Sequence, residues 1–207
     1  MSRYFQERSR GLNKRARTRG ILLDSALDVF AESGISNTRL DDITKYAGMA
    51  NATFYNHFKD KDELITALAK AIALELIAPV DERLAGIKDA PVRIVVANNI
   101  IMHAALEQKS WSTVLGGAFY LLPPRYIDVG SYLKLLIARG VEEGSFTDAP
   151  DNFQLDQVTA VFISGLRTLD KGDVNIIDRT AQNMLRVLGM SPAKVSSALE
   201  KGHAFYS

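Results

Sequence analysis

The sequence contains no cysteine, and only three of its 207 residues are histidines. Without cysteine the chain can form neither a disulfide framework nor a thiolate site for zinc or an iron–sulfur cluster. The histidines lie in different segments and show no HExxH or similar ligand spacing, so we expect no metal site. No apolar run approaches the roughly 20 residues that cross a bilayer, and the basic N-terminus lacks the apolar segment of a signal peptide. We therefore expect a cytoplasmic protein with no membrane partner and no cofactor.

The motifs of common enzyme classes are also missing. The glycines at Gly116-Gly117 and Gly165 are not framed as GxxxxGK or GxGxxG, and no Gly-x-Ser-x-Gly sequence occurs. The adjacent carboxylates Asp41-Asp42 and Glu142-Glu143 would point about 100° apart on a helix, so neither pair can readily act on one substrate. The sequence is not expected to be that of an enzyme.

Positive charge is concentrated at the front of the chain. Residues 1–61 contain eleven Lys or Arg against seven Asp or Glu, so this region carries +4 while the remainder carries −3. Most of the excess lies in seven bases near the N-terminus, Arg3, Arg8, Arg10, Lys14, Arg15, Arg17 and Arg19. Such a cluster suits a phosphate backbone or an anionic membrane surface, although a solvated tail without a partner has the same composition.

Apolar residues recur at three- and four-residue steps along the chain, and no strand alternation of useful length occurs. Helices are predicted over Arg17 to Glu32, Leu40 to Ala47, Asn51 to His57, Asp60 to a stop at Pro79, Pro91 to Leu106, Tyr126 to Glu143, Asp151 to Leu169, Asn175 to Leu188, and Pro192 to about Gly202. Gly34 suits a helix end, and Thr38 with Asp41 and Asp60 with Glu63 suit helix starts. The predicted fold is all-α, with an N-terminal three-helix helix-turn-helix domain and a C-terminal helical domain.

Residues 47–59 read AGMANATFYNHFK. Two short helices joined at Gly48, after a longer helix, are typical of a helix-turn-helix whose second short helix enters the DNA major groove. The small residues at 50–53 would let that helix approach base edges, and Tyr55 and Lys59 could donate to phosphates. Phe54 and Phe58, four residues apart, would anchor it in the core. An ordinary helical hairpin with a solvated polar edge is the alternative interpretation.

The segment from Arg17 to about Ile77 resembles the DNA-binding domain of the tetracycline-repressor (TetR) family, most closely in the stretch LDDITKYAGMANATFYNHFKDKDEL. The residues that carry the resemblance are, in order, Thr38, Ile43, Ala47, Gly48, Thr53, Tyr55, His57, Phe58, Lys59 and Leu64. The resemblance implies a homodimeric, ligand-responsive transcriptional regulator, usually a repressor, which a small and largely apolar effector releases from a pseudo-palindromic double-stranded operator. Residues 1–16 would then be a basic arm near the DNA backbone, 17–77 the DNA-binding domain with its helix-turn-helix at about 38–58, and 79–207 the ligand-binding and dimerisation domain.

The DNA-binding residues expected from the resemblance and from their chemistry are Arg17, Thr38, Arg39, Lys45, Ala50, Asn51, Ala52, Thr53, Tyr55, Asn56, His57, Lys59 and Lys61. The sequence departs from the family pattern at two places. Ala50 stands where a serine often caps the recognition helix, a loss of about 1 kcal/mol, and Lys45-Tyr46 replaces a small residue. Asn51 could cap in place of that serine or read an adenine edge, and the sequence leaves both roles open.

The C-terminal domain resembles the family only in the number and order of its helices. By that resemblance, the last two long helices would form a four-helix dimer interface through Val158, Val161, Phe162, Gly165, Leu169, Ile177, Ala181, Met184 and Leu188. The same stripes could instead face the core of one subunit. An apolar cavity is the usual small-molecule site, and the candidate ligand-binding residues are Met102, His103, Leu106, Trp111, Leu115, Phe119, Tyr120, Tyr126, Tyr132, Leu136 and Phe162.

Two other functions remain open from sequence. A helical protein-interaction module without DNA binding would have the same helical pattern, although it would not need phosphate donors at both ends of the third helix. A peripheral membrane binder would need several large apolar residues among the N-terminal bases, and the sequence there has few, namely Tyr4, Phe5 and Leu12. We therefore favour the DNA-binding regulator.

Overall fold

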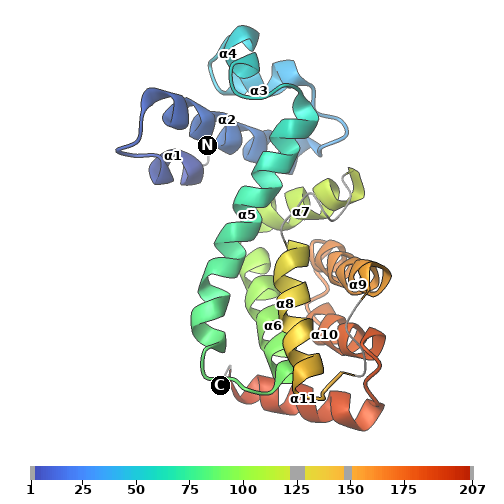
Figure 1. Ribbon diagram of the computed structural model, residues 1–207. Coiled ribbons are helices and arrows are strands. Elements are labelled where there is room, and N and C mark those ends of the chain that lie inside the picture. Colours follow the sequence, from blue (N-terminus) through green and yellow to red (C-terminus); the bar gives the residue numbers. More distant parts are fainter. Residues whose placement is uncertain (1–2, 122–128, 147–150, 206–207) are drawn as a thin grey trace. The chain divides into compact units, whose positions relative to one another are not determined.

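The protein is described from a computed structural model covering residues 3–121, 129–146 and 151–205 (Figure 1). Within these residues the regular elements are all helices, which confirms the predicted all-α fold. They are α1 (Tyr4–Arg8), α2 (Lys14–Ser33), α3 (Leu40–Tyr46), α4 (Asn51–Tyr55), α5 (Lys61–Leu84), α6 (Ala90–Glu107), α7 (Lys109–Leu121), α8 (Val129–Glu142), α9 (Asn152–Leu169), α10 (Ile176–Val187) and α11 (Pro192–Ala204).

The chain forms two compact units. The first comprises Met1–Ile72 with Lys109–Leu122, and the second comprises Ala73–Gln108 with Pro123–Ser207. Helix α5 therefore contributes residues to both units, and α7 joins the N-terminal unit although it follows α6 in the chain. The sequence predicted neither this return nor the α7 helix itself, because the expected helices stop at Leu106 and resume at Tyr126.

Helix α2 is the centre of the first unit. Its side chains Leu22, Leu27 and Phe30 are fully buried, and α1, α3 and α7 pack against it. The α2 helix begins at Lys14, where the side chain of Asn13 accepts a hydrogen bond from the backbone N–H of Ala16. It ends at Ser33, and the following residue, Gly34, has a φ of +78°, a backbone conformation that favours glycine.

The basic arm is partly folded, because α1 packs against α2. The carboxylate of Asp24 accepts the backbone N–H groups of Phe5 at 3.0 Å and Gln6 at 2.8 Å, so a residue of α2 caps the start of α1. Burial raises the pKa of Asp24, while these two hydrogen bonds oppose that shift. Gly20 allows the close approach, since a Cβ there would lie 2.7 Å from the carbonyl oxygen of Phe5.

The start of α3 differs from the sequence expectation by one residue. Arg39 occupies the N-cap position, and the carboxylate of Asp42 accepts its backbone N–H at 2.8 Å. The hydroxyl of Thr38 instead donates to the carbonyl oxygen of Gly34 at 2.8 Å, so it holds the turn after α2. The cap expected at Asp60 is present, because its carboxylate accepts the backbone N–H of Glu63 at 2.8 Å.

Pro79 does not end the long helix, contrary to the sequence expectation. Helix α5 continues through it to Leu84. A proline inside a helix removes one backbone hydrogen bond and crowds the preceding turn. The five residues beyond it bring Val80 and Leu84 to complete burial, which offsets that cost.

The second unit is built around α6, which packs against α8, α9, α10 and α11. Buried residues lie all around α6, as expected of a helix at the centre of a bundle. Helices α9 and α10 approach closely at Gly165, where an added Cβ would overlap the side chain of Thr180. No helix in the described residues combines the length and apolar character needed to cross a membrane.

Candidate nucleic-acid interface and internal cavity

Helices α3 and α4 are joined by the tight turn that the sequence predicts. Gly48 has a φ of +65°, and its N–H donates to the carbonyl oxygen of Lys45, while the N–H of Met49 donates to that of Thr44. A left-handed residue followed by this backward hydrogen bond closes the end of α3. Ala50 then occupies the N-cap of α4 without a side-chain hydrogen bond, as expected from its lack of an oxygen.

Asn51 does not cap α4, because Ala50 occupies that position, and the side chain of Asn51 bonds within the protein. Its side-chain oxygen accepts a hydrogen bond from the Thr44 hydroxyl at 2.6 Å, and its nitrogen donates to the Asp41 carboxylate at 2.7 Å. The Asn51 amide therefore joins the first residue of α4 to α3. Only contacts across the turn reveal this role, because the side chain bonds to residues seven and ten positions earlier.

The aromatic anchors of α4 are buried as predicted. Phe54 and Phe58 are 0% and 1% exposed, and their ring centroids are 5.6 Å apart. Burying Phe54 turns the opposite face of α4 outward, and Tyr55 is 60% exposed. Ala52 and Asn56 are also exposed. The surface of α4 that is free to approach another molecule thus combines a small residue, an amide and a phenol.

Arginines from α2 lie beside the end of α4. The guanidinium of Arg15 donates to the carbonyl oxygen of Asn56 at 3.5 Å, and that of Arg19 lies 4.9 Å from the centre of the Phe58 ring. Burial, together with the positive charges of Arg15 and Arg19, lowers the pKa of His57. The Nδ1 atom of His57 is buried without a hydrogen-bond partner among the described residues. The guanidinium groups of Arg15 and Arg19 form a cationic border along one end of α4, beside the His57 ring, whose lowered pKa favours its neutral form. We call this border the α2–α4 basic edge (Arg15, Arg19 and His57).

The other predicted DNA-binding residues have different surroundings. Arg17, Arg39, Lys45 and Lys59 are exposed, whereas Thr53 is half-buried. The ammonium of Lys61 donates to the carbonyl oxygens of Ile35 and Thr38, at 2.6 Å each. Thr38 is only 3% exposed. The geometry of Lys61 and Thr38 favours a role in holding the α2–α3 turn, and their contact with DNA remains a prediction.

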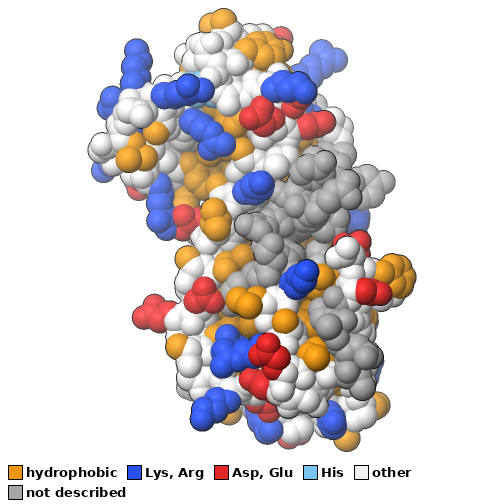
Figure 2. All heavy atoms as spheres, in the orientation of Figure 1, with side chains coloured by type: hydrophobic (Ala, Val, Ile, Leu, Met, Phe, Trp, Pro, Cys, Tyr) orange, Lys and Arg blue, Asp and Glu red, His pale blue; other side chains and the backbone are white. Residues whose placement is uncertain are grey.

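Lys and Arg side chains project from the surface of the α1–α4 region, with acidic groups between them (Figure 2). Lys59 illustrates this exposure, because 86% of its side chain is accessible and its ion pair with Asp60 is 4.0 Å long. Exposed cations on flexible stems can reach phosphates without first breaking a strong internal contact. The surface is suited to a nucleic-acid backbone.

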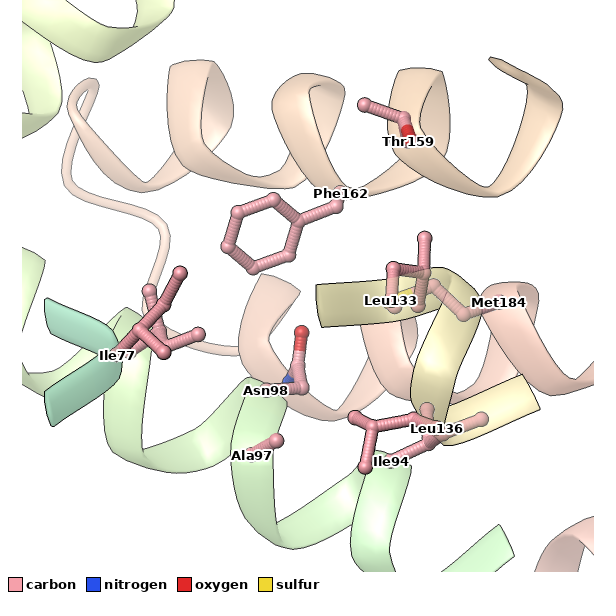
Figure 3. Close-up of a pocket in the computed structure, with 10 residues that line it drawn as sticks. Ile77, Ile94, Ala97, Asn98, Leu133, Leu136, Thr159, Phe162 and Met184 are labelled. Atoms are coloured by element: carbon pink, nitrogen blue, oxygen red, sulfur yellow. The ribbon is translucent and has the colours of Figure 1, made fainter. Parts of the chain in front are cut away.

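The second unit contains an apolar cavity. It is lined by Ile77, Ile94, Ala97, Asn98, Ile101, Leu133, Leu136, Thr159, Phe162 and Met184, from α5, α6, α8, α9 and α10 (Figure 3). The room inside for water-sized molecules is only about 40 Å³. A single water needs about 10–15 Å³ by this measure, so a ring-sized ligand requires a lining side chain to move.

Two of the predicted ligand-binding residues, Leu136 and Phe162, line this cavity. Met102 is fully buried elsewhere, Leu106 is 41% exposed and His103 is exposed. Trp111 and Leu115 belong to the first unit, where Trp111 stacks edge-to-face with Tyr4. Phe119, Tyr120, Tyr126 and Tyr132 lie outside the residues whose side chains are described.

The predicted dimer-interface stripe faces the core of one subunit. Its members Val158, Phe162, Gly165, Leu169, Ile177, Ala181, Met184 and Leu188 are all buried, and Val161 is half-buried. Because α9 and α10 pack against each other and against α6, these side chains are already covered within a single chain. A dimer built on these helices must use their outward faces.

The described residues hold no group of three His, Cys, Asp or Glu side chains able to bind a metal ion. The polar groups of the cavity are an amide and a hydroxyl, Asn98 and Thr159. The cavity is therefore a place for an apolar molecule, and the exposed surface around α4 is suited to bind a polyanion.

Comparison with known proteins gives matches to parts of the chain. The family model "Bacterial regulatory proteins, tetR family" matches residues 22–68. The regulator TtgW of Pseudomonas putida is 32% identical over 100 residues, which are 47% of this chain and 72% of that protein. The regulator YvdT of Bacillus subtilis is 35% identical over 68 residues, and AcrR of Shigella flexneri is 43% identical over 51. These two matches span only 35% and 24% of the relatives' lengths.

Solved structures resemble most of the chain in fold. RolR in complex with resorcinol superposes with a TM-score of 0.71, covering 90% of this chain and 94% of its own, at 24% identity. FadR of Bacillus subtilis in complex with stearoyl-CoA superposes with a TM-score of 0.64, covering 81% and 96%, at 17% identity. At these identities the likeness concerns the fold of both units and not their ligands.

Proposed function

Because the chain belongs to the TetR family of bacterial regulatory proteins, which are regulators and not enzymes, we propose that it is a sequence-specific DNA-binding transcriptional regulator. In this proposal it acts as a homodimeric repressor that a small, largely apolar ligand releases from a pseudo-palindromic operator. The observation that carries the proposal is the α3–turn–α4 unit, which buries Phe54 and Phe58 and thereby turns Ala52 and Tyr55 outward.

On the DNA side, α4 enters the major groove and the α2–α4 basic edge lies along the phosphate backbone. Ala52 is small enough for close approach to a base edge, and the Tyr55 hydroxyl can donate to a phosphate. The exposed bases of the arm, including Arg3 and Arg10, add salt-sensitive affinity with little sequence information. Asn51 supports this surface through its hydrogen bonds to α3 and does not read a base itself.

Two recognition helices must be placed on successive turns of DNA, about 34–36 Å apart, for a pseudo-palindrome to be read. A homodimer supplies this geometry. The outward face of α9 offers an interface, because Phe153 is 70% exposed and the exposed residues Ala160 and Ser164 are small enough for close helix packing. This face replaces the buried stripe expected from the sequence.

The cavity in the second unit is the proposed effector site. Four of its lining residues, Ile94, Ala97, Asn98 and Ile101, belong to α6. The next helix, α7, begins only two residues after α6 ends, and it packs on α2 of the DNA-binding unit. A ligand that displaces α6 therefore acts on α7 through the chain, and it shifts DNA affinity if it binds the two arrangements with different affinity.

Selection from a random duplex library, repeated at two salt concentrations, tests the proposal. We expect an inverted repeat whose binding weakens as salt rises. The double variant Tyr55→Phe with Lys59→Ala should weaken binding to every sequence alike, whereas Ala52 substitutions should alter sequence preference. The exposed Lys70→Ala on α5 is a matched control that leaves both unchanged.

Two results would contradict this function. Sequence-independent binding that is insensitive to the Tyr55 and Lys59 changes would contradict the placement of α4 in the DNA major groove. Absence of DNA binding with or without small molecules would favour a helical protein-interaction module, the alternative that the sequence left open.

A further inference from the structure

Asn98 is one of two polar residues in the cavity wall, and one of its atoms has no hydrogen-bond partner among the described residues. The residue is 2% exposed. Its side-chain nitrogen donates to the carbonyl oxygen of Ile177 at 3.0 Å and to the side-chain oxygen of Asn99 at 3.3 Å. Its own side-chain oxygen is buried and accepts no hydrogen bond within the described residues. A buried acceptor without a donor is costly, so its retention calls for an explanation.

The orientation of the amide follows from its neighbours. If the Asn98 amide were turned over, its oxygen would face the carbonyl oxygen of Ile177, and two acceptors would meet. The nitrogen must therefore point toward α10. Figure 3 shows the oxygen on the opposite side, directed to the part of the cavity where the Phe162 ring lies.

The rest of the cavity offers acceptors and apolar surface. Thr159 is the other polar residue of the lining, and its hydroxyl donates to the carbonyl oxygen of Leu155 at 2.7 Å, which leaves its oxygen free only to accept. No charged side chain belongs to the lining among the described residues. Among the described residues, a molecule inside this cavity thus meets hydrogen-bond acceptors and no free donor or charge.

We propose that the ligand of this cavity is a small neutral molecule with an apolar body and one hydrogen-bond donor, a hydroxyl or amino group, which donates to the side-chain oxygen of Asn98. The proposal rests on the proposed function in taking this cavity as the effector site. A carboxylate is excluded because the lining would leave its charge unpaired. A hydrocarbon of the same shape binds less well because it leaves the Asn98 oxygen without a partner.

Binding of such a molecule also requires movement. The cavity holds only about 40 Å³ of room for water-sized molecules, and the Phe162 ring lies on the side to which the Asn98 oxygen points (Figure 3). Displacing this ring enlarges the space on the side of the acceptor. The hydrogen bond from the ligand's donor to Asn98 therefore stabilises the same displacement of the Phe162 ring that makes room for the apolar body.

The test uses the full-length protein with three probes of similar size: phenol, toluene and benzoate. Toluene replaces the hydroxyl of phenol by a methyl group, and benzoate carries a charge. Dissociation constants are measured by NMR titration for the wild type, for Asn98→Leu and for the control Thr180→Val, whose hydroxyl is buried but does not line the cavity. Comparing affinity ratios between variants cancels the different hydrophobicity of the probes.

The ratio of the toluene dissociation constant to the phenol dissociation constant should be larger in the wild type than in Asn98→Leu by about tenfold or more. Thr180→Val should keep the wild-type ratio. Benzoate should bind more weakly than phenol. Equal ratios in the wild type and Asn98→Leu would overturn the proposal, as would benzoate binding as tightly as phenol or no binding of any probe to the wild type. If Asn98→Leu does not fold, tighter wild-type binding of toluene than of phenol would overturn it.

The DNA selection described above is independent of these titrations. An inverted repeat recovered together with a lack of hydroxyl discrimination would reject the ligand assignment and leave the regulator intact. Hydroxyl discrimination through Asn98 without any DNA binding would reject the regulator and leave the ligand assignment intact.

Discussion

Replacing Asn51 by alanine separates two ways in which this residue could act on DNA. Asn51→Ala removes the hydrogen bonds to Thr44 and Asp41 that join α4 to α3. Helix α4 has only five residues and no side-chain cap at Ala50, so it depends on such contacts for its orientation. Alanine at the first helical position introduces no new strain, because its backbone is compatible with a helix.

The size of the effect follows from the two bonds that are lost. Together they contribute about 1–2 kcal/mol, since the bond to Asp41 is exposed and therefore weak. For a chain of this size the melting temperature should fall by roughly 3–6 °C. If the same free energy is needed to restore α4 on DNA, affinity falls about 5- to 30-fold, and equally for all sequences.

Melting curves and DNA-binding titrations on a set of related duplexes measure these quantities. Thr44→Val is the matched variant, because Thr44 is 1% exposed and cannot contact DNA directly. It should reproduce much of the loss, and the double variant should lose less than the sum of the two. The reasoning fails if Asn51→Ala changes the preference at one base pair while its melting temperature stays that of the wild type.

Three further changes have outcomes that the structure determines. Burial and two neighbouring arginines lower the pKa of His57 in the folded state. The folded protein therefore loses stability as pH falls below 6.5, the ordinary pKa of histidine, because the unfolded chain binds the proton more readily. Below pH 6.5, the free energy of unfolding measured in urea should fall less steeply for His57→Gln than for the wild type. Gly165→Ala places a Cβ against the side chain of Thr180 and should lower the free energy of unfolding by about 1–3 kcal/mol. Adding Thr180→Ala should restore part of that loss. An unchanged urea midpoint in Gly165→Ala would mean that α9 and α10 are not so closely packed. Pro79→Ala restores an N–H that can donate to the carbonyl of Glu75 in α5, and it should raise the free energy of unfolding by about 1–3 kcal/mol. A decrease would show that the helix accommodates the proline by a local geometry that alanine does not keep.

Features that depend on neighbouring residues in the chain were predictable from the sequence. Gly34 and Gly48 adopt the positive φ angles that their positions at helix ends indicate. Asp60 caps α5, and the four-residue spacing of Phe54 and Phe58 places both rings in the core. Capping, left-handed turns and helical periodicity involve residues within about four positions, so the local pattern contains the information needed to recognise them.

The roles of polar side chains were less predictable. The sequence placed Thr38 at the start of α3, but its hydroxyl closes the turn from Gly34, and the ammonium of Lys61 bonds to that same turn. Asp24 caps a helix whose bonded N–H groups lie 18 and 19 positions before it. A hydroxyl, carboxylate or ammonium has the same appearance in sequence whether it bonds within the protein or faces a ligand, and only the positions of distant backbone groups decide which.

The apolar stripes of α9 and α10 likewise combine a property that the sequence predicts with one that it does not. The periodicity of Val158, Ala181 and Met184 determined that these residues face something apolar, but it did not determine whether that surface belongs to α6 of the same chain or to a second copy. Similarly, the sequence identified Phe162 as a candidate cavity residue but gave no reason to select Asn98. The sequence by itself therefore determined most of the long helices, the turns at Gly34 and Gly48, and the resemblance to the family, because these depend on local spacing. Only the tertiary structure decided which faces meet, because that depends on packing between residues far apart in the chain.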